Sequence, residues 1–244
     1  MKKRSFLIVI PARFSSKRFP GKPLALINNK PMINYVWDIC KDVVNSNNII
    51  VATEDIKINK HCIKNKMNVI MTSKKCLTGT DRVYEVSKKL KRDIYINVQG
   101  DEPLINRKDL ESFIKFSLKN YKLTINAYSE IKNTDEYSSL NVPKLVYDKN
   151  DYLLYMSRSK IPGNKKDEFI KAYKQVCMYS FPKKDLTLIG KMKKKSLFEK
   201  IEDIEILRFI EMGIKVKMFR VKKPSIAVDI DSDIKKVEAL LSNK

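Results

Sequence analysis

The stretch that decides the fold is Ser5–Pro23, "SFLIVIPARFSSKRFPGKP". It joins an uninterrupted apolar run, Phe6–Ile10, to a loop with four cationic side chains, two serines and three prolines. An uninterrupted apolar run is typical of a strand that is buried on both faces of a sheet. The loop is too basic to be buried and too rich in proline to be helical. The stretch therefore predicts a central strand whose carboxyl end opens into a stiff, cationic loop.

The same alternation continues outward from this strand through the first half of the chain. Apolar runs predict further strands over 48–53, 68–72 and 93–99, and amphipathic runs predict helices over 32–44, 55–66 and 79–91. Apolar strands separated by helices indicate a parallel sheet that is covered on both faces. Such sheets bind ligands at the carboxyl ends of their strands. In this chain those ends are followed by polar loops at 11–23, 53–55, 73–80 and 99–103.

The second half of the chain has a different pattern. It predicts a helix over 108–119, strands over 123–128 and 174–181, a hairpin over 143–158, one long helix over 198–213, strands over 215–221 and 225–230, and a last helix over 232–241. The hairpin and the strand after it have antiparallel character. We interpret the chain as a single domain, 1–244, in which a section over 140–195 covers the site or forms a dimer contact.

Composition and charge exclude several classes of function. The net charge is +22, but the cations are mostly lysines spread along the chain, so we expect a small anionic ligand and no nucleic-acid partner. No apolar run reaches the ~18 residues of a membrane span, which predicts no membrane partner. Four scattered cysteines indicate free thiols and a cytoplasmic location. The single histidine, His61, argues against a zinc site or a Ser-His-Asp triad.

Two carboxylates at the ends of apolar runs are candidate metal ligands. Asp101 follows "INVQG" and Asp229 follows "SIAV". The carboxyl end of a strand is a common place for the Mg²⁺ of a bound nucleotide, because this ion prefers oxygen ligands and keeps waters and phosphate oxygens around it. We therefore predict that Asp101 and Asp229 hold one Mg²⁺ between them.

The cationic loop matches neither of the common phosphate-binding motifs. Gly21-Lys22 lacks the upstream glycine of a P-loop, and there is no G-x-G-x-x-G. Side chains must then bind the phosphates, as backbone amides do in those two motifs. The candidates are Arg13, Arg18 and Lys22, since arginine gives bidentate contacts to phosphate and lysine a point charge. Three cations on a stiff loop, beside a metal site, predict a triphosphate site.

Six motifs make the resemblance to one family specific. They are "IPARFSSKRFPGKPL", "GTDR", "NVQGDEP", "PKLVYDKNDYLLYMSRSKIP", "EDIEILRFIEMG" and "AVDIDSDIKKVE". In this order, and over nearly the whole chain, they resemble the 3-deoxy-manno-octulosonate cytidylyltransferases, or CMP-Kdo synthetases. The resemblance implies a three-layer, nucleotidyltransferase-type (Rossmann-like) α/β fold with a parallel-rich central sheet, a small antiparallel dimerisation section and a homodimer. It also implies Mg²⁺-dependent transfer of CMP from CTP to the anomeric hydroxyl of 3-deoxy-manno-octulosonate (Kdo), releasing pyrophosphate and activating the sugar for lipopolysaccharide or capsule synthesis.

Carried over residue by residue, the resemblance also implies roles for particular side chains. The implied catalytic residues are Arg13, Lys22, Asp101 and Asp229, of which the last two are the metal ligands. The residues implied to bind CTP are Pro11, Ala12, Arg13, Lys22, Gly79, Thr80 and Asp101. The residues implied to bind the sugar are Arg82, Gln99, Arg158, Tyr179 and Glu205.

The chain departs from the family pattern in the acceptor half. Where the family has His-x-Gly-x-Tyr-x-x-Arg, this chain has Gln175, Cys177, Tyr179 and Pro182, so only the tyrosine is kept. The acceptor is therefore Kdo or a related 3-deoxy-2-ulosonic acid. Two alternatives stay open, which are a cytidylyltransferase for a different acidic sugar and a sugar-1-phosphate nucleotidylyltransferase, although the latter usually has a glycine-rich first loop.

Overall fold

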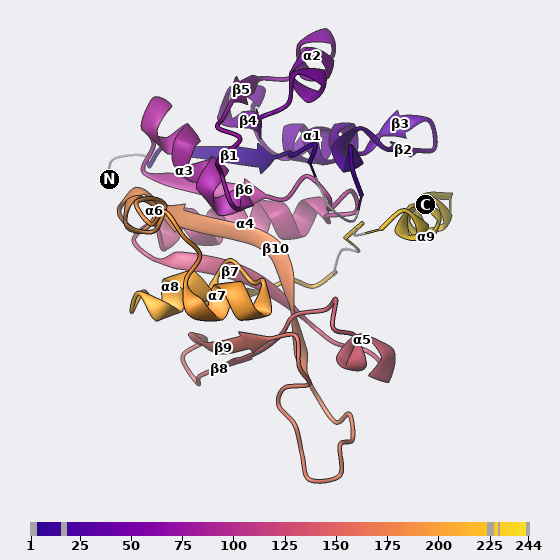
Figure 1. Cartoon of the computed structure of the whole chain (residues 1–244), viewed down its shortest axis with the longest axis vertical. Coiled ribbons are helices and arrows are strands. Elements are labelled where there is room, and N and C mark those ends of the chain that lie inside the picture. Colours follow the sequence, from indigo (N-terminus) through magenta and orange to yellow (C-terminus); the bar gives the residue numbers. More distant parts are fainter. Residues whose placement is uncertain (1–3, 16–18, 224–226, 229, 243–244) are drawn as a thin grey trace.

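A mixed β-sheet forms the centre of the molecule (Figure 1). The computed structural model describes residues 4–15, 19–223, 227–228 and 230–242. Within them the strand order is β11-β7-β10-β6-β1-β4-β5, and a hairpin of β8 and β9 is attached to β10. The strands are β1 (Phe6–Pro11), β4 (Ile49–Thr53), β5 (Val69–Met71), β6 (Ile94–Val98), β7 (Thr124–Glu130), β8 (Lys144–Tyr147), β9 (Leu153–Ser157), β10 (Tyr173–Pro182) and β11 (Val216–Arg220). A separate two-stranded ribbon pairs β2 (Leu26–Ile27) with β3 (Lys30–Pro31).

Along the seven-strand order from β11 to β5, four of the six neighbouring pairs are parallel. β1 pairs in parallel with both β4 and β6, β4 with β5, and β7 with β11. β10 is the exception, because it runs antiparallel between β6 and β7. The predicted parallel-rich α/β sheet is confirmed, and the antiparallel section joins it through β10 rather than standing apart.

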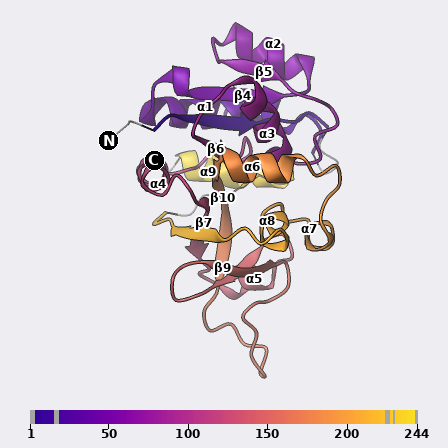
Figure 2. The ribbon, with the colours of Figure 1, turned by 90° about the vertical axis from the view of Figure 1, so that its left-hand side faces the viewer.

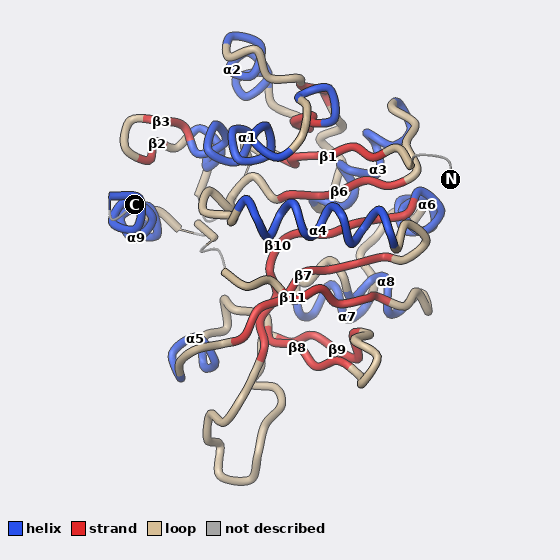
Figure 3. Tube along the Cα trace, turned by 180° about the vertical axis from the view of Figure 1, so that it is seen from behind, coloured by secondary structure: helices blue, strands red, loops and turns tan. Residues whose placement is uncertain are grey.

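Helices cover both faces of this sheet, which gives three layers (Figures 1 and 3). They are α1 (Met32–Val43), α2 (Ile56–Lys64), α3 (Gly79–Lys89), α4 (Arg107–Lys119), α5 (Thr134–Ser138), α6 (Lys183–Gly190), α7 (Leu197–Glu202), α8 (Leu207–Glu211) and α9 (Ser232–Ser242). Successive side chains of β1 point to opposite faces. Ile8 and Ile10 pack with α1, α2 and α4, whereas Leu7 and Val9 pack with α3, α6 and α8. β1 is therefore buried on both sides, as its unbroken apolar run predicts.

The section 140–195 contains the hairpin β8–β9, strand β10 and helix α6. Figure 2 shows the hairpin and the connection from β9 to β10 at the end of the molecule farthest from α2. The hairpin turn lies at 148–151, as expected, where Asp151 N donates to Asp148 O over 2.9 Å and Asp151 has a φ of 56°. The division of the chain at 140 and 195 stays a prediction.

One predicted element is wrong and another falls mostly outside the described residues. The single helix over 198–213 is broken into α7 and α8, because Asp203 adopts a left-handed conformation (φ 51°) that an α-helix cannot continue through. Of the predicted strand over 225–230, only Ala227, Val228 and Ile230 are described, and none of them is in a strand. Across the described ranges, no helix is long and apolar enough to cross a membrane. The four cysteines are free thiols, as predicted.

Candidate active site

A cavity of about 1010 Å³ opens at the carboxyl ends of β1 and β6. Its wall includes eleven of the residues predicted for the site, namely Pro11, Ala12, Arg13, Lys22, Gly79, Arg82, Gln99, Asp101, Arg158, Tyr179 and Glu205. Thr80 is buried behind the wall and does not line the cavity. Asp229, the second predicted metal ligand, lies outside the described residues, as does Arg18. The fold therefore gathers nearly all of the described candidates around one space.

One side of the cavity is formed by the loops after β1 and β6, and we call it the donor side. Lys22 begins a short 3-10 turn, Lys22–Leu24, and Gly21 before it has a φ of 73° that favours glycine. The Lys22 ammonium donates to Asp101 Oδ2 over 2.5 Å and to the carbonyl of Val228 over 2.8 Å. Two motifs that lie 79 residues apart in the sequence thus meet in one ion pair.

The backbone at the end of β6 is shaped to pass close to the first loop. A Cβ atom on Gly100 would lie 2.9 Å from the carbonyl oxygen of Pro11, which is too close for any side chain. Glycine at this position therefore lets the two strand ends approach each other. Asp101 follows directly, and its carbonyl accepts a hydrogen bond from Val228 N over 2.9 Å.

The opposite side is formed by β9, β10 and the α7–α8 segment, and we call it the acceptor side. β10 carries a bulge, because its register with β7 shifts between Val176 and Tyr179. The bulged Cys177 N donates to Glu102 Oε1 over 3.0 Å, which brings the loop after β6 onto β10. Bulges of this kind often redirect side chains beside active sites. The departure from the family pattern at Cys177 therefore falls on the residue that shapes this wall.

Gln175, which also departs from the family pattern, and Tyr179, which is kept, have defined positions. Gln175 Nε2 donates to Asn126 Oδ1 of β7 over 3.0 Å, so its amide is oriented by the neighbouring strand. Tyr179 is buried, and burial, together with Cys177, Glu205 and Glu102, raises the pKa of its hydroxyl well above the ordinary value. The Tyr179 phenol is therefore protonated at neutral pH and acts only as a neutral hydrogen-bonding group.

The amino terminus of α3 is held by the side chains of its N-cap and first turn and by Glu205 from the connection between α7 and α8. The Thr78 hydroxyl caps the helix, with Asp81 in the reciprocal position of a capping box. Glu205 accepts from Gly79 N over 3.1 Å, from Thr80 N over 2.8 Å and from the Thr80 hydroxyl over 2.6 Å. Glu205 thus lines the cavity while both of its carboxylate oxygens bind protein groups.

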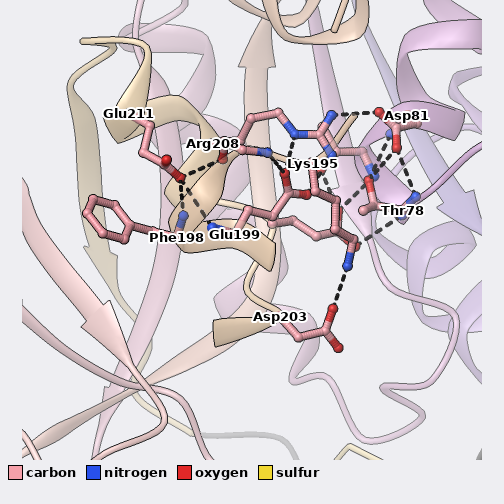
Figure 4. Close-up of polar contacts among 12 residues, drawn as sticks. Thr78, Asp81, Lys195, Phe198, Glu199, Asp203, Arg208 and Glu211 are labelled. Carbon is pink, nitrogen blue, oxygen red and sulfur yellow. Dashed lines mark hydrogen bonds and ion pairs between the residues drawn. The ribbon is translucent and has the colours of Figure 1, made fainter. Parts of the chain in front are cut away.

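A buried ionic network supports this arrangement from behind (Figure 4). Arg208 is 1% exposed and donates to both carboxylate oxygens of Glu199, over 2.6 and 2.5 Å. Its third contact reaches Asp81 of α3 over 2.7 Å. Glu199 is fully buried, so neither charge of this pair has access to water. Arg208 therefore connects α7, α8 and α3, from which the acceptor side takes its shape.

Arg158 is bound mainly to backbone carbonyls. Its guanidinium donates to the carbonyls of Glu202, Leu140 and Asp203 over 2.6, 2.9 and 3.2 Å. A guanidinium has five N–H donors, so these contacts use only part of its capacity. The buried ammonium of Lys144 donates to the carbonyl of Arg158, and burial lowers the pKa of Lys144.

Asp203 faces several cations at the rim of the cavity. Lys195 donates to its carboxylate over 2.5 Å (Figure 4). Partial burial raises the pKa of Asp203, but the hydrogen bond from Lys195 and the charges of Lys195, Arg158 and Arg13 outweigh it, so the pKa lies below its usual value. Lys195 comes from "KMKKK", which the sequence pattern alone does not connect with the site.

Sequence reasoning missed other charged residues at this site. Glu54 follows β4 directly and forms an ion pair with Arg82 over 2.6 Å. Its position at a strand's carboxyl end was the available signal, but an acid there does not reveal which cation it meets. Lys174 and Glu136, which form an ion pair, line the cavity itself, whereas Glu54 reaches it through Arg82. Their chain positions, 38 apart, carry no motif that would have connected them.

One of the two carboxylates predicted to hold magnesium lies within the described residues. Within the described part of the chain, no group of three or more His, Cys, Asp or Glu residues is arranged to hold a metal. The prediction needs two carboxylates, of which Asp101 is described. The carboxylate oxygens of Asp101 are ligands of the kind that Mg²⁺ prefers. Asp101 Oδ2 already accepts a hydrogen bond from the Lys22 ammonium, so this carboxylate suits a site for positive charge.

Comparisons with known proteins agree with the fold and the cavity. The model of the family described as "Cytidylyltransferase" matches residues 7–219. A 3-deoxy-manno-octulosonate cytidylyltransferase of Parabacteroides distasonis is 37% identical over 98% of this chain and 99% of its own length. An 8-amino-3,8-dideoxy-manno-octulosonate cytidylyltransferase of Shewanella baltica is 35% identical over 96% of this chain and 98% of its own length.

A solved structure is similar over the whole fold. It is that of a CMP:2-keto-3-deoxy-manno-octonic acid synthetase complexed with CTP, with a TM-score of 0.89, 33% identity and coverage of 98% of this chain and 99% of that one. The sheet, its helices and the polar cavity at the strand ends are those of a nucleotidyltransferase. More narrowly, the chain belongs to the cytidylyltransferase family.

Proposed function

We propose that this protein transfers CMP from CTP to the anomeric hydroxyl of a 3-deoxy-2-ulosonic acid, Kdo or a close relative, and releases pyrophosphate. The observation that carries the proposal is the meeting of Lys22 and Asp101 in one cavity with Arg13 and Arg158. Lys22 and Arg13 supply positive charge for a triphosphate, and Asp101 supplies a carboxylate for the metal ion that accompanies it. Arg158 supplies positive charge for an acidic sugar. The full-length similarity to octulosonate cytidylyltransferases supports this choice over a sugar-1-phosphate nucleotidylyltransferase.

The protein's part in this reaction is to position two reactants and stabilise charge. Arg13 and Lys22 would bind the phosphates and neutralise the departing pyrophosphate. The triphosphate would offer Lys22 an anionic partner in addition to Asp101. The anomeric hydroxyl would attack the α-phosphorus in line with the leaving pyrophosphate, as the P–O bond to the β-phosphate breaks and the hydroxyl proton passes to solvent.

Mg²⁺ is part of the proposal. Asp101 and Asp229 would hold it, since carboxylates at the ends of two strands supply the oxygen ligands that it prefers. The ion would contribute charge stabilisation and a lowered pKa for a coordinated hydroxyl. Such a site explains how the chemistry can proceed without a histidine base. His61, the single histidine of the chain, lies on α2 and is not among the residues that line the cavity.

The acceptor would be held on the opposite side by its carboxylate and hydroxyls. Arg158 keeps donors for a carboxylate after its three carbonyl contacts. Gln99, Tyr179 and the amide of Gln175 supply neutral polar groups. The relatives named for Kdo and for its 8-amino derivative have similar identities, 37% and 35%, so both sugars belong to the proposed class.

The test is pyrophosphate release with CTP, Mg²⁺ and a panel of acceptors. The panel contains Kdo, its 8-amino-3,8-dideoxy derivative and other 2-keto-3-deoxy acids, and UTP and dTTP replace CTP in parallel reactions. We expect release with CTP and at least one octulosonate. Release only with sugar 1-phosphates, or CTP binding without release, would contradict the proposal.

We further propose that the enzyme is a cytoplasmic homodimer. Support comes from its free thiols and from an exposed apolar group on α7, Leu197, Phe198 and Ile201, of which Phe198 packs edge-on against Tyr155 of β9. A second copy would cover this group. Light scattering after size-exclusion chromatography should give twice the 28.5 kDa chain mass, and Ile201→Asp should lower it. An unchanged mass in that variant would place the interface elsewhere.

A further inference from the structure

A buried ion pair at the cavity joins Glu54, which follows β4, to Arg82 of α3. Arg82 Nη2 of α3 lies 2.6 Å from Glu54 Oε2, and the two side chains are only 4% and 6% exposed. Removing two charges from water is costly, and their mutual attraction often does no more than offset that cost. Replacing such a pair by apolar residues is frequently neutral for stability. The position of this pair therefore needs an explanation other than stability.

The second oxygen of Glu54 connects the pair to the cationic loop. Glu54 Oε1 accepts from Phe14 N over 3.1 Å and, at the limit of a hydrogen bond, from the Ser15 hydroxyl over 3.5 Å. The N–H of Phe14 belongs to the same planar peptide as the carbonyl of Arg13. Glu54 thus fixes the orientation of the peptide that follows Arg13. Lys57 of α2 adds a cation over the Phe14 ring, 4.9 Å from its centre.

Arg82 is held by protein groups on its other side. Its Nη1 donates to the Thr72 hydroxyl over 2.7 Å and reaches the carbonyl of Ser73 over 3.4 Å. Thr72 and Ser73 follow β5, so Arg82 and Glu54 together join the segments after β1, β4 and β5. The guanidinium is thereby held by groups of the segments that follow β4 and β5.

We propose that Glu54 is a positioning residue for CTP, which acts by fixing the Phe14 amide and with it Arg13, and that Arg82 neutralises the buried Glu54 carboxylate. This assigns Arg82 of "GTDR" to the nucleotide, whereas the resemblance implies that it binds the sugar. The inference rests on the proposed cytidylyl transfer. Its failure is distinguishable from failure of that function, because CTP affinity can be measured without any acceptor.

The decisive comparison is between two double variants that both lack the ion pair. Glu54→Met/Arg82→Met removes both charges and also the acceptor of the Phe14 N–H. Glu54→Gln/Arg82→Met removes both charges but keeps an amide oxygen where the carboxylate oxygen lies. Neither leaves a lone buried charge, so both are expected to fold, and thermal unfolding checks this. The two differ in whether Phe14 N has a partner at position 54.

We expect Glu54→Met/Arg82→Met to weaken CTP binding by roughly tenfold to a hundredfold, since misplacement by about 1 Å acts on this scale. Glu54→Gln/Arg82→Met should stay within about threefold of the wild type. The KM for the acceptor should change by less than about threefold in both, as expected for a group acting on one substrate only. Calorimetric titration with CTP and steady-state kinetics give these values.

The control variant is Glu85→Gln on the same helix. Glu85 accepts from Ser73 N over 2.7 Å but makes no hydrogen bond or ion pair with the described residues of the cationic loop, 11–15 and 19–23, so CTP affinity should not change. Equal CTP affinity in the two double variants, or a loss confined to the acceptor KM, would overturn the inference. A wild-type enzyme that binds CTP but reacts with no octulosonate would instead contradict the proposed function.

Discussion

The donor side and the acceptor side of the cavity use their charged residues in different ways. On the donor side, Lys22 and Asp101 come from loops after parallel strands and meet each other inside the cavity. On the acceptor side, Glu205 binds the amino terminus of α3 and Arg158 binds three backbone carbonyls. Lys22 and Asp101 therefore present their charges to a ligand. Glu205 and most of the Arg158 contacts instead bind protein groups and shape the wall.

This difference teaches that a motif residue beside a cavity need not be there to bind the ligand. Arg82 and Glu205 both line the cavity and both belong to recognisable motifs. Arg82 is nevertheless paired with Glu54, and Glu205 with backbone amides. Substitutions on the acceptor side should therefore affect stability and acceptor binding together, whereas substitutions on the donor side should affect turnover or CTP binding with little loss of stability.

The largest expected effect is on stability and comes from the acceptor side. Arg208→Met would leave the fully buried Glu199 without its partner, and an uncompensated buried charge costs about 3–5 kcal/mol. Urea unfolding should show this loss, and at a temperature where the variant is folded the acceptor KM should rise more than the CTP KM. As a control, Lys115→Met breaks the exposed pair with Glu111 and should cost less than about 1 kcal/mol. A similarly small loss in Arg208→Met would mean that the network does not hold α3.

The next effect is on turnover and comes from the donor side. Asp101→Asn removes the charge that Lys22 contacts and one predicted metal ligand. Loss of such an electrostatic group should reduce kcat by about a hundredfold or more. Pyrophosphate release over a range of Mg²⁺ concentrations measures this, and the melting temperature should change little because the carboxylate is partly exposed. Turnover near the wild-type value at ordinary Mg²⁺ would exclude Asp101 as a ligand.

Sequence patterns predicted the donor side better than the acceptor side, and the reason is physical. β1, β4 and β6 are buried on both faces, so their unbroken apolar runs identified the strands and the loops at their ends. Asp101 and Lys22 lie directly in those loops. The antiparallel position of β10 and the break at Asp203 depend on contacts between distant segments, which local periodicity does not contain. Sequence motifs also do not predict that Arg82 pairs with Glu54 or that Glu205 binds α3, because these contacts join distant segments too.

A smaller effect should separate the two substrates. Lys22→Ala removes a point charge from the phosphates, so the KM for CTP should rise by about tenfold or more while the acceptor KM stays nearly constant. Steady-state kinetics with each substrate varied in turn measures both constants. Lys30→Ala, an exposed lysine paired with Asp38 away from the cavity, is the control and should change neither. A change in the acceptor KM alone would mean that Lys22 binds the acceptor and not CTP.

The smallest effect is a pH-dependent one at the rim, where the two sides meet. Asp203 faces Lys195, Arg158 and Arg13, and its pKa lies below the unfolded value of 3.8. Its carboxylate therefore stabilises the folded state fully above about pH 4 and loses this effect as the pH falls through the folded-state pKa. Asp203→Asn, which keeps a residue that tolerates a positive φ, should lower stability by less than about 1 kcal/mol near pH 7, because the Asp203 side chain is 69% exposed.

The difference between the wild type and Asp203→Asn should shrink as the pH falls below 3.8 and disappear below the lowered folded-state pKa, where the wild-type carboxylate also becomes neutral. Denaturant unfolding of both proteins across this range measures it. Ionic strength gives an independent check, since the rim is exposed and salt screens exposed charges. A difference that persists at low pH and high salt would mean that Asp203 acts through its left-handed backbone conformation and not through its charge.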